Sequence, residues 1–153
     1  RKKKVHFMEY FDLVMPQVAL AQGFGRIGCF FAGCCYGRET ELPIGIIFKN
    51  SKIAPNGVRL MPTQLLSSAG DFLFAFLMMA YAKKKRKDGK IAAMYLLLYS
   101  FGRFFIEFLR DDYRGSIGFL STSQIISVFI FLLGVCIFVL SEKGKFAKKV
   151  YEE

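Results

Sequence analysis

Two arginines lie inside otherwise apolar stretches of this 153-residue chain. Arg26 interrupts the segment GRIGCFFAGCCYGR, and Arg103 lies in YSFGRFFIEFLRDD, four residues before Glu107 and seven before Arg110. An ionised side chain in such a stretch is unfavourable unless it is paired or faces a cavity, so each arginine marks a candidate functional site. Residues four apart share a helix face. Arg103 and Glu107 are therefore predicted to pair, with Arg110 on the same face.

This predicted helix face, with Arg103, Glu107 and Arg110, has two cations and one anion, which leaves one positive charge. Guanidinium groups bind phosphate oxygens bidentately, so the excess charge suits a phosphate group. Arg38, Arg110 and Arg114 could instead be interfacial residues whose charged ends reach toward water. Small residues near Arg26 and Arg103 are predicted to let neighbouring helices or a ligand approach closely. They are Gly23, Gly25, Gly28, Gly33 and Gly102.

Four long runs of the sequence are mostly apolar and contain few or no charged residues: 11–37, 66–82, 91–109 and 117–140. Each approaches or exceeds the roughly 20 residues that cross a bilayer core of about 30 Å. The last run contains no charged residue, whereas a soluble helix of this length normally carries a polar face. We therefore predict an all-α fold, a polytopic bundle of four transmembrane helices with a short external loop that could carry a β segment. The alternative is a soluble helical bundle with a large core.

The chain has a formal net charge of +10, and most of its basic residues fall into clusters at 1–4, 83–90 and 143–149. Because these clusters lie between the apolar runs, nucleic acid is not expected as a partner. Basic loops stay in the cytoplasm, and four crossings place all three clusters, and the C-terminus, on that side. The polar motifs of the four helices then meet at the outer leaflet, where the nearest phosphates belong to phospholipids.

The sequence shows no internal repeat and no linker, so residues 1–153 are predicted to form one transmembrane domain. The chain begins with RKKK, without an initiator methionine or a signal-peptide pattern. We expect it to be the C-terminal part of a longer polytopic protein.

The cysteines leave two interpretations open. Cys29, Cys34 and Cys35 lie near the outer end of the first predicted helix, where they could be small packing residues or a thiol pair for redox or acyl chemistry. Adjacent cysteines rarely form a disulfide without strain. A metal site would need more ligands, and the single histidine, His6, is predicted on the cytoplasmic side. No metal and no cofactor are therefore predicted, and Cys136 is interpreted as a packing residue.

Taken together, five segments resemble, in order and spacing, the C-terminal part of the prolipoprotein diacylglyceryl transferases. They are GRIGCFFAGCCYGR, LPIGIIF, MPTQLLSSAG, YSFGRFFIEFLRDD and LSTSQIIS. The resemblance implies an enzyme of the bacterial cytoplasmic (inner) membrane that moves the diacylglyceryl group of phosphatidylglycerol onto the lipobox cysteine of a prolipoprotein and releases glycerol phosphate. The implied partners are phosphatidylglycerol, the prolipoprotein signal peptide and membrane lipids.

The resemblance also implies roles for individual residues. Arg103 would stabilise the departing phosphate and Glu107 would hold it in place, which makes these two the catalytic pair. Arg26 would contact the phosphatidylglycerol headgroup. The complete substrate-binding set is Arg26, Gln64, Arg110, Gly25 and Gly33, with Gln124 as a weaker polar contact.

The chain departs from the family pattern at several positions. Cys29 and Ala32 replace asparagines, Cys34 replaces a glutamate, Met61 replaces the histidine before Pro62, and Leu66 and Ser67 replace a tyrosine and a glutamate. The family's histidine-glycine-glycine motif is absent from these 153 residues, and the general base is not identified. Two alternatives therefore stay open: a divergent membrane lipid transferase with another acceptor, and a noncatalytic phospholipid-binding membrane protein.

Overall fold

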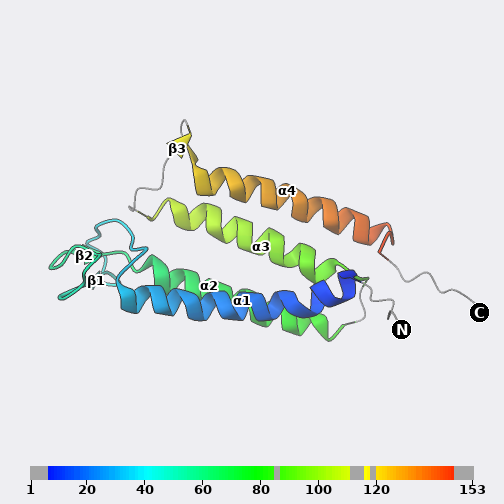
Figure 1. Ribbon diagram of the computed structural model, residues 1–153, viewed down its shortest axis with the longest axis horizontal. Helices are drawn as coiled ribbons and strands as arrows, with labels where there is room; N and C mark the ends of the chain where they lie inside the picture. The colour runs from blue at the N-terminus through cyan, green and yellow to red at the C-terminus, as the bar shows by residue number, and fades with distance from the viewer. Residues whose placement is uncertain (1–6, 85–86, 111–115, 118–119, 147–153) are drawn as a thin grey trace, which may run out of the picture.

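Four long helices make up most of the computed structural model, which describes residues 7–84, 87–110, 116–117 and 120–146 (Figure 1). The helices are α1 (Phe7–Ala32), α2 (Thr63–Ala82), α3 (Lys90–Glu107) and α4 (Thr122–Glu142). α1 packs along α2, both contact α3, and α4 packs mainly against α3. The prediction of a mostly helical fold with four helices is confirmed.

Two of these helices, α2 and α4, are long and apolar enough to cross a membrane. Their apolar windows have mean hydropathies of 1.5 and 2.6, and only 22% and 17% of those windows are buried inside the protein. The core helix of a soluble protein would be mostly buried, so these exposed apolar faces favour a lipid environment over water. Among the described residues, α1 and α3 do not reach the combination of length and apolar composition that marks a candidate membrane span. Both helices carry charged residues within their length.

α1 ends in a Schellman motif at Gly33. The Gly33 N–H donates to the Phe30 carbonyl and the Cys34 N–H donates to the Cys29 carbonyl, while Gly33 has a φ of +67°. Glycine adopts this left-handed conformation without steric strain, and a Cβ here would also collide with the Ser51 side chain. The helix therefore stops at this residue because of both its backbone conformation and its packing.

Backbone hydrogen bonds join the segments that follow α1, precede α2 and follow α3. The Gly37 N–H donates to the Met61 carbonyl at 3.0 Å, the Met61 N–H to the Arg38 carbonyl at 2.9 Å, and the Arg38 N–H to the Leu109 carbonyl at 2.9 Å. These bonds hold the ends of three helices together at one end of the bundle. Buried backbone groups need such partners.

Short strands lie at the same end of the bundle (Figure 1). β1 (Ile46–Ile47) pairs antiparallel with β2 (Arg59–Leu60) in the connection between α1 and α2. β3 (Ser116–Ile117) pairs antiparallel with β4 (Leu120–Ser121) just before α4. A β segment, as anticipated for one of the loops, is therefore present.

The opposite end of the bundle carries basic residues. The Lys87 Nζ lies 3.4 Å from the Glu142 Oε2, and the Lys90 Nζ forms an ion pair with the same carboxylate. Lys87 and Lys90, which belong to the basic cluster at 83–90, thus lie beside the end of α4. The first basic cluster, residues 1–4, lies outside the described residues.

Asp12 of α1 caps the N-terminus of α3 from outside that helix. Its carboxylate oxygens accept hydrogen bonds from the Gly89 and Ala92 N–H groups, both at 2.9 Å, and the residue is buried. The first N–H groups of a helix lack intrahelical partners, and Gly89, at the N-cap position, has no side chain to supply one. The adjoining hydrophobic core consists of Met15, Ala19, Ala75, Met78, Ile91 and Ala92.

The close packing predicted at the glycines holds at some positions only. A Cβ at Gly23 would lie 2.7 Å from the Phe72 ring, and one at Gly102 would lie 3.2 Å from the Phe74 ring. A Cβ at Gly25 or Gly28 would meet nothing within 4 Å. The prediction of close helix approach is therefore wrong for Gly25 and Gly28, which lie on the exposed side of α1.

We predict that Asp12→Ala lowers the free energy of unfolding by about 2 kcal/mol, because it leaves two buried N–H groups of α3 without their acceptor. Thermal unfolding of the purified protein in detergent measures the change. Asp12→Asn, which keeps an acceptor oxygen, should recover part of the loss. Wild-type melting of Asp12→Ala would show that this cap contributes nothing.

We also predict that Gly33→Ala destabilises the protein more than Gly57→Ala. Both glycines have positive φ, +67° and +79°, but a Cβ at Gly57 would meet nothing within 4 Å. Gly57→Ala should therefore show only the backbone strain, about 1 to 2 kcal/mol, whereas Gly33→Ala adds the collision with Ser51. The same melting assay compares them, and equal losses would contradict the packing role of Gly33.

Candidate active site

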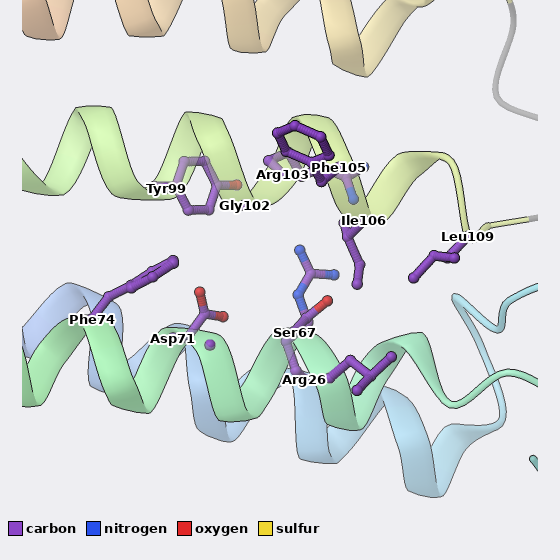
Figure 2. Close-up of a pocket in the computed structure, with 12 residues that line it drawn as sticks. Arg26, Ser67, Asp71, Phe74, Tyr99, Gly102, Arg103, Phe105, Ile106 and Leu109 are labelled. Carbon is purple, nitrogen blue, oxygen red and sulfur yellow. The ribbon is translucent and has the colours of Figure 1, made fainter. Parts of the chain in front are cut away.

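A cavity of about 230 Å³ lies where α1, α2 and α3 meet near the strand-bearing end of the bundle (Figure 2). Most of its lining is apolar, but each of the three helices contributes one charged residue: Arg26 from α1, Asp71 from α2 and Arg103 from α3. In Figure 2 the Arg26 guanidinium extends between α2 and α3, and the Asp71 carboxylate points toward Tyr99. Two arginines 77 positions apart in the sequence thus line one cavity.

Arg103 is held by an ion pair and a hydrogen bond. Its Nη2 lies 3.0 Å from the Glu107 Oε2 and donates to the Ser123 Oγ of α4, also at 3.0 Å. The two charged side chains are only 11% and 8% exposed. The predicted pairing of Arg103 with Glu107 is confirmed, and Ser123 adds a contact that sequence analysis did not identify. Within the described residues, the buried Nη1 of Arg103 has no hydrogen-bond partner.

Asp71 is a further member of the site that sequence analysis did not assign. It is buried, lines the cavity with Arg26, and interacts with it electrostatically. The signal in the sequence was that Asp71 is the one charged residue in the run 66–82. When ionised, Asp71 offsets part of the excess positive charge that was predicted from Arg103, Glu107 and Arg110 alone.

Arg110 occupies a different position from the one predicted. α3 ends at Glu107, so Arg110 lies beyond the helix, although it still interacts electrostatically with Arg103. Its backbone pairs with Gly37, and its carbonyl accepts a hydrogen bond from the Arg38 Nε at 3.4 Å. The residue is buried but is absent from the cavity lining. The expectation of a shared helical face is wrong because the helix ends too early.

The polar groups at the starts of α2 and α4 have structural partners. The Gln64 Nε2 donates to the Cys34 carbonyl at 2.8 Å, and its Oε1 is buried without a hydrogen-bond partner among the described residues. Gln124 forms a capping box with Ser121, in which the side-chain oxygen of each residue accepts a hydrogen bond from the backbone N–H of the other. The geometry therefore gives Gln124 a helix-capping role. Neither glutamine lines the cavity.

Gly25 and Gly33 also lie outside the cavity lining. Gly33 terminates α1, as described above, and Gly25 is exposed with open space where a Cβ would be. Their predicted contact with substrate stays a prediction.

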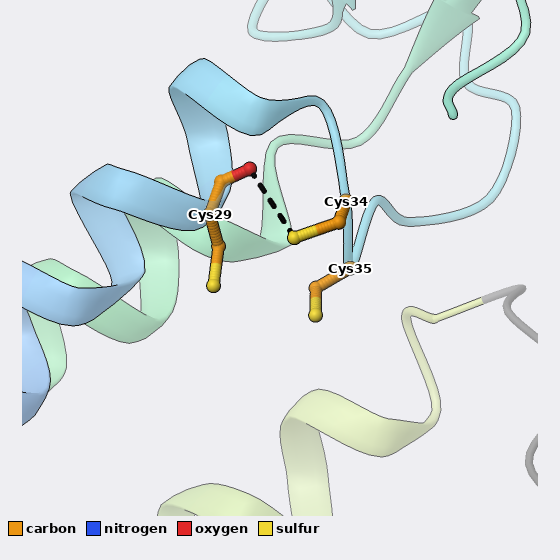
Figure 3. Close-up of side chains that lie close together, drawn as sticks. All are labelled: Cys29, Cys34 and Cys35. Carbon is orange, nitrogen blue, oxygen red and sulfur yellow. Dashed lines mark hydrogen bonds between the residues drawn. The ribbon is translucent and has the colours of Figure 1, made fainter. Parts of the chain in front are cut away.

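The three cysteines at the end of α1 lie together (Figure 3). Their sulfur atoms are all within 4.8 Å of one another, and the Cys34 Sγ donates to the Cys29 carbonyl at 3.6 Å. All are free thiols of intermediate exposure. Burial first, and then the neighbouring Cys29 and Cys35, together raise the pKa of the Cys34 thiol to about 11, so the thiol stays protonated at neutral pH. This protonation disfavours Cys34 as a nucleophile. His6 lies outside the described residues.

Comparison with known proteins identifies the relatives of this chain. The family model described as prolipoprotein diacylglyceryl transferase matches residues 1–140. The chain is 51% identical over 138 residues to the phosphatidylglycerol–prolipoprotein diacylglyceryl transferase of Clostridium tetani, covering 90% of this chain and 55% of that protein. It is 52% identical over 145 residues to the second such enzyme of Clostridium perfringens, covering 94% and 57%.

A more distant relative, the transferase of Clostridioides difficile, is 37% identical over 144 residues, covering 94% of this chain and 55% of that protein. The chain spans about half the length of the curated relatives it matches. The regions matched by the family model and by these relatives cover nearly all of the chain, including the cavity-lining residues of α1, α2 and α3. The chain therefore belongs to the prolipoprotein diacylglyceryl transferase family.

Proposed function

We propose that the protein containing this chain transfers the diacylglyceryl group of phosphatidylglycerol to the lipobox cysteine thiol of a prolipoprotein. The observation that carries the proposal is the cavity that Arg26 and Arg103 both line, inside an apolar bundle. The names of the relatives support the substrates. In this reaction the acceptor sulfur bonds to a glycerol carbon as the carbon–oxygen bond to phosphate breaks. The thiol loses its proton, and glycerol phosphate leaves.

The two arginines meet the electrostatic requirement of this reaction. The leaving phosphate gains negative charge as the carbon–oxygen bond breaks, and preorganised cations in a site poor in water stabilise such charge strongly. Arg103 would bind the departing phosphate with the guanidinium nitrogens that Glu107 and Ser123 leave free, and Arg26 would bind the headgroup. A planar guanidinium matches phosphate oxygens in pairs, which also orients the lipid.

Glu107, Gln64 and Arg110 act around these arginines in the proposed mechanism. Glu107 fixes the Arg103 side chain within its cavity wall, which keeps the guanidinium in place before the lipid arrives. Gln64, one turn before Ser67 of the cavity lining, would offer its unpartnered Oε1 to a polar group of the substrate. Arg110 would add positive charge at the same end of α3.

We further propose that the four helices form a multi-pass membrane bundle of the bacterial inner membrane, with the cavity near the outer face and the C-terminus in the cytoplasm. The apolar faces of α2 and α4 support insertion, because they are mostly unburied within the protein. The ion pairs of Lys87 and Lys90 with Glu142 place basic residues at the end opposite the cavity. No feature of the described residues favours a different acceptor or a noncatalytic role.

We predict that Arg26→Ala and Arg103→Ala each lower diacylglyceryl transfer about a hundredfold, because each removes one donor to the developing phosphate charge. The assay follows labelled phosphatidylglycerol in vesicles onto a lipobox peptide. Arg103→Lys should recover part of the activity, since it keeps the charge but loses the planar fork. Arg59→Ala, an exposed cation of β2 at the same end of the bundle, is the matched control. Activity equal to that of the control would refute the site.

Glu107→Gln is predicted to lower the turnover number about tenfold, equivalent to roughly 1.4 kcal/mol, while changing the phosphatidylglycerol KM little. The reason is that Glu107 positions Arg103 and need not touch the lipid itself. Steady-state kinetics with varied phosphatidylglycerol separate the two parameters, and Glu39→Gln in the exposed loop after α1 serves as control. A change confined to KM would instead indicate that Glu107 acts through lipid binding.

A further inference from the structure

The three clustered cysteines form a group that the proposed transfer reaction does not use. The Schellman motif itself brings two of them together, because the Cys34 N–H donates to the Cys29 carbonyl in the hydrogen bond of the motif that spans more residues. Cys35 follows with a φ of +59°, and it is the one residue other than glycine with positive φ in the part of the chain that the structure describes. Such a backbone conformation is strained and persists only when its surroundings hold it.

The N-terminus of α2 provides that support. The Thr63 Oγ1 donates to the Cys35 carbonyl at 2.9 Å, and the Gln64 Nε2 donates to the Cys34 carbonyl at 2.8 Å. Both supporting residues are buried, whereas the three cysteines keep intermediate exposure. The turn is therefore fixed from its inner side, and the sulfurs stay accessible to a small ion.

The distances between the sulfurs suit coordination of one cation. Metal–thiolate bonds of about 2.3 Å place three sulfurs around one ion about 4 Å apart, and the three Sγ atoms already lie within 4.8 Å of one another. Displacements of the sulfur atoms by less than about 1 Å would close the site. Soft thiolate ligands select Cu(I) and Zn²⁺ over Mg²⁺ and Ca²⁺.

We propose that Cys29, Cys34 and Cys35 form a binding site for a soft, sulfur-preferring cation, with Cu(I) as the best match. Three thiolates complete a trigonal Cu(I) site, whereas structural Zn²⁺ normally takes four protein ligands. No histidine, aspartate or glutamate side chain joins this group among the described residues. Binding requires the thiols to lose their protons to the solvent, and it joins the end of α1 to the turn that α2 supports.

The test uses the complete protein, reduced and purified in detergent under anaerobic conditions. Thiol titration must first show all the cysteines reduced, and Cu(I) is then added against a chromophoric Cu(I) chelator. We expect one tightly bound Cu(I), an ultraviolet thiolate-to-copper absorption band, and a higher melting temperature with the ion bound. Cys29→Ser, Cys34→Ser and Cys35→Ser should each weaken binding at least about tenfold, because each removes one of three thiolate ligands.

Cys136→Ser is the matched control, because it removes one exposed thiol on α4 and leaves the three-cysteine group intact. It should bind Cu(I) as the wild type does. Equal Cu(I) affinity in the wild type and the triple serine variant would overturn the proposal, as would loss of binding in Cys136→Ser alone. Zn²⁺ binding as tight as Cu(I) binding would refute the choice of ion. Melting temperatures without metal and transfer activity report whether each variant is folded.

Discussion

A charged side chain inside an apolar helix is stable only where another polar group or a cavity receives it, and this constraint organises the bundle. Arg103 satisfies it through Glu107 and Ser123, and Arg26 satisfies it by sharing a cavity with Asp71. Because these residues come from all four helices, the helices must pack in one arrangement for the charges to be accommodated. The same arrangement leaves guanidinium groups beside an apolar cavity, which is the environment in which cations act most strongly on a phosphate.

The arrangement also needs helix ends that are fixed in place. At the cavity end, backbone bonds among Gly37, Arg38, Met61 and Leu109 tie three chain segments together. At the opposite end, the carboxylate of Asp12 replaces the missing cap of α3. Each device satisfies backbone groups that the helices themselves leave unpaired. Small relative movements of α1 and α3 would separate Arg26 from Arg103, so these polar contacts are requirements of the site as well as of the fold.

Sequence analysis succeeded where the determining interaction is local. The spacing of Arg103 and Glu107 predicted their ion pair, because four residues make one helical turn, and the apolar runs predicted four helices. It failed for Arg110, since nothing in the apolar run marked the end of α3 at Glu107. It could not assign Asp12 or Asp71, whose partners lie on other helices. Gly25 and Gly33 looked alike in sequence, and only the fold separates an exposed glycine from one that ends a helix.

The cysteines show how a departure from the family pattern can leave the proposed chemistry intact. The cavity is lined by Arg26, one helical turn before Cys29, while the three sulfurs lie at the turn beyond the helix end. Gln64 connects the two regions, because its Nε2 binds the Cys34 carbonyl and its Oε1 remains unpartnered within the described residues. That hydrogen bond uses the backbone of Cys34 and not its side chain. The support that α2 gives to the turn thus acts through backbone atoms of Cys34, and it holds the helix end near Arg26 in place.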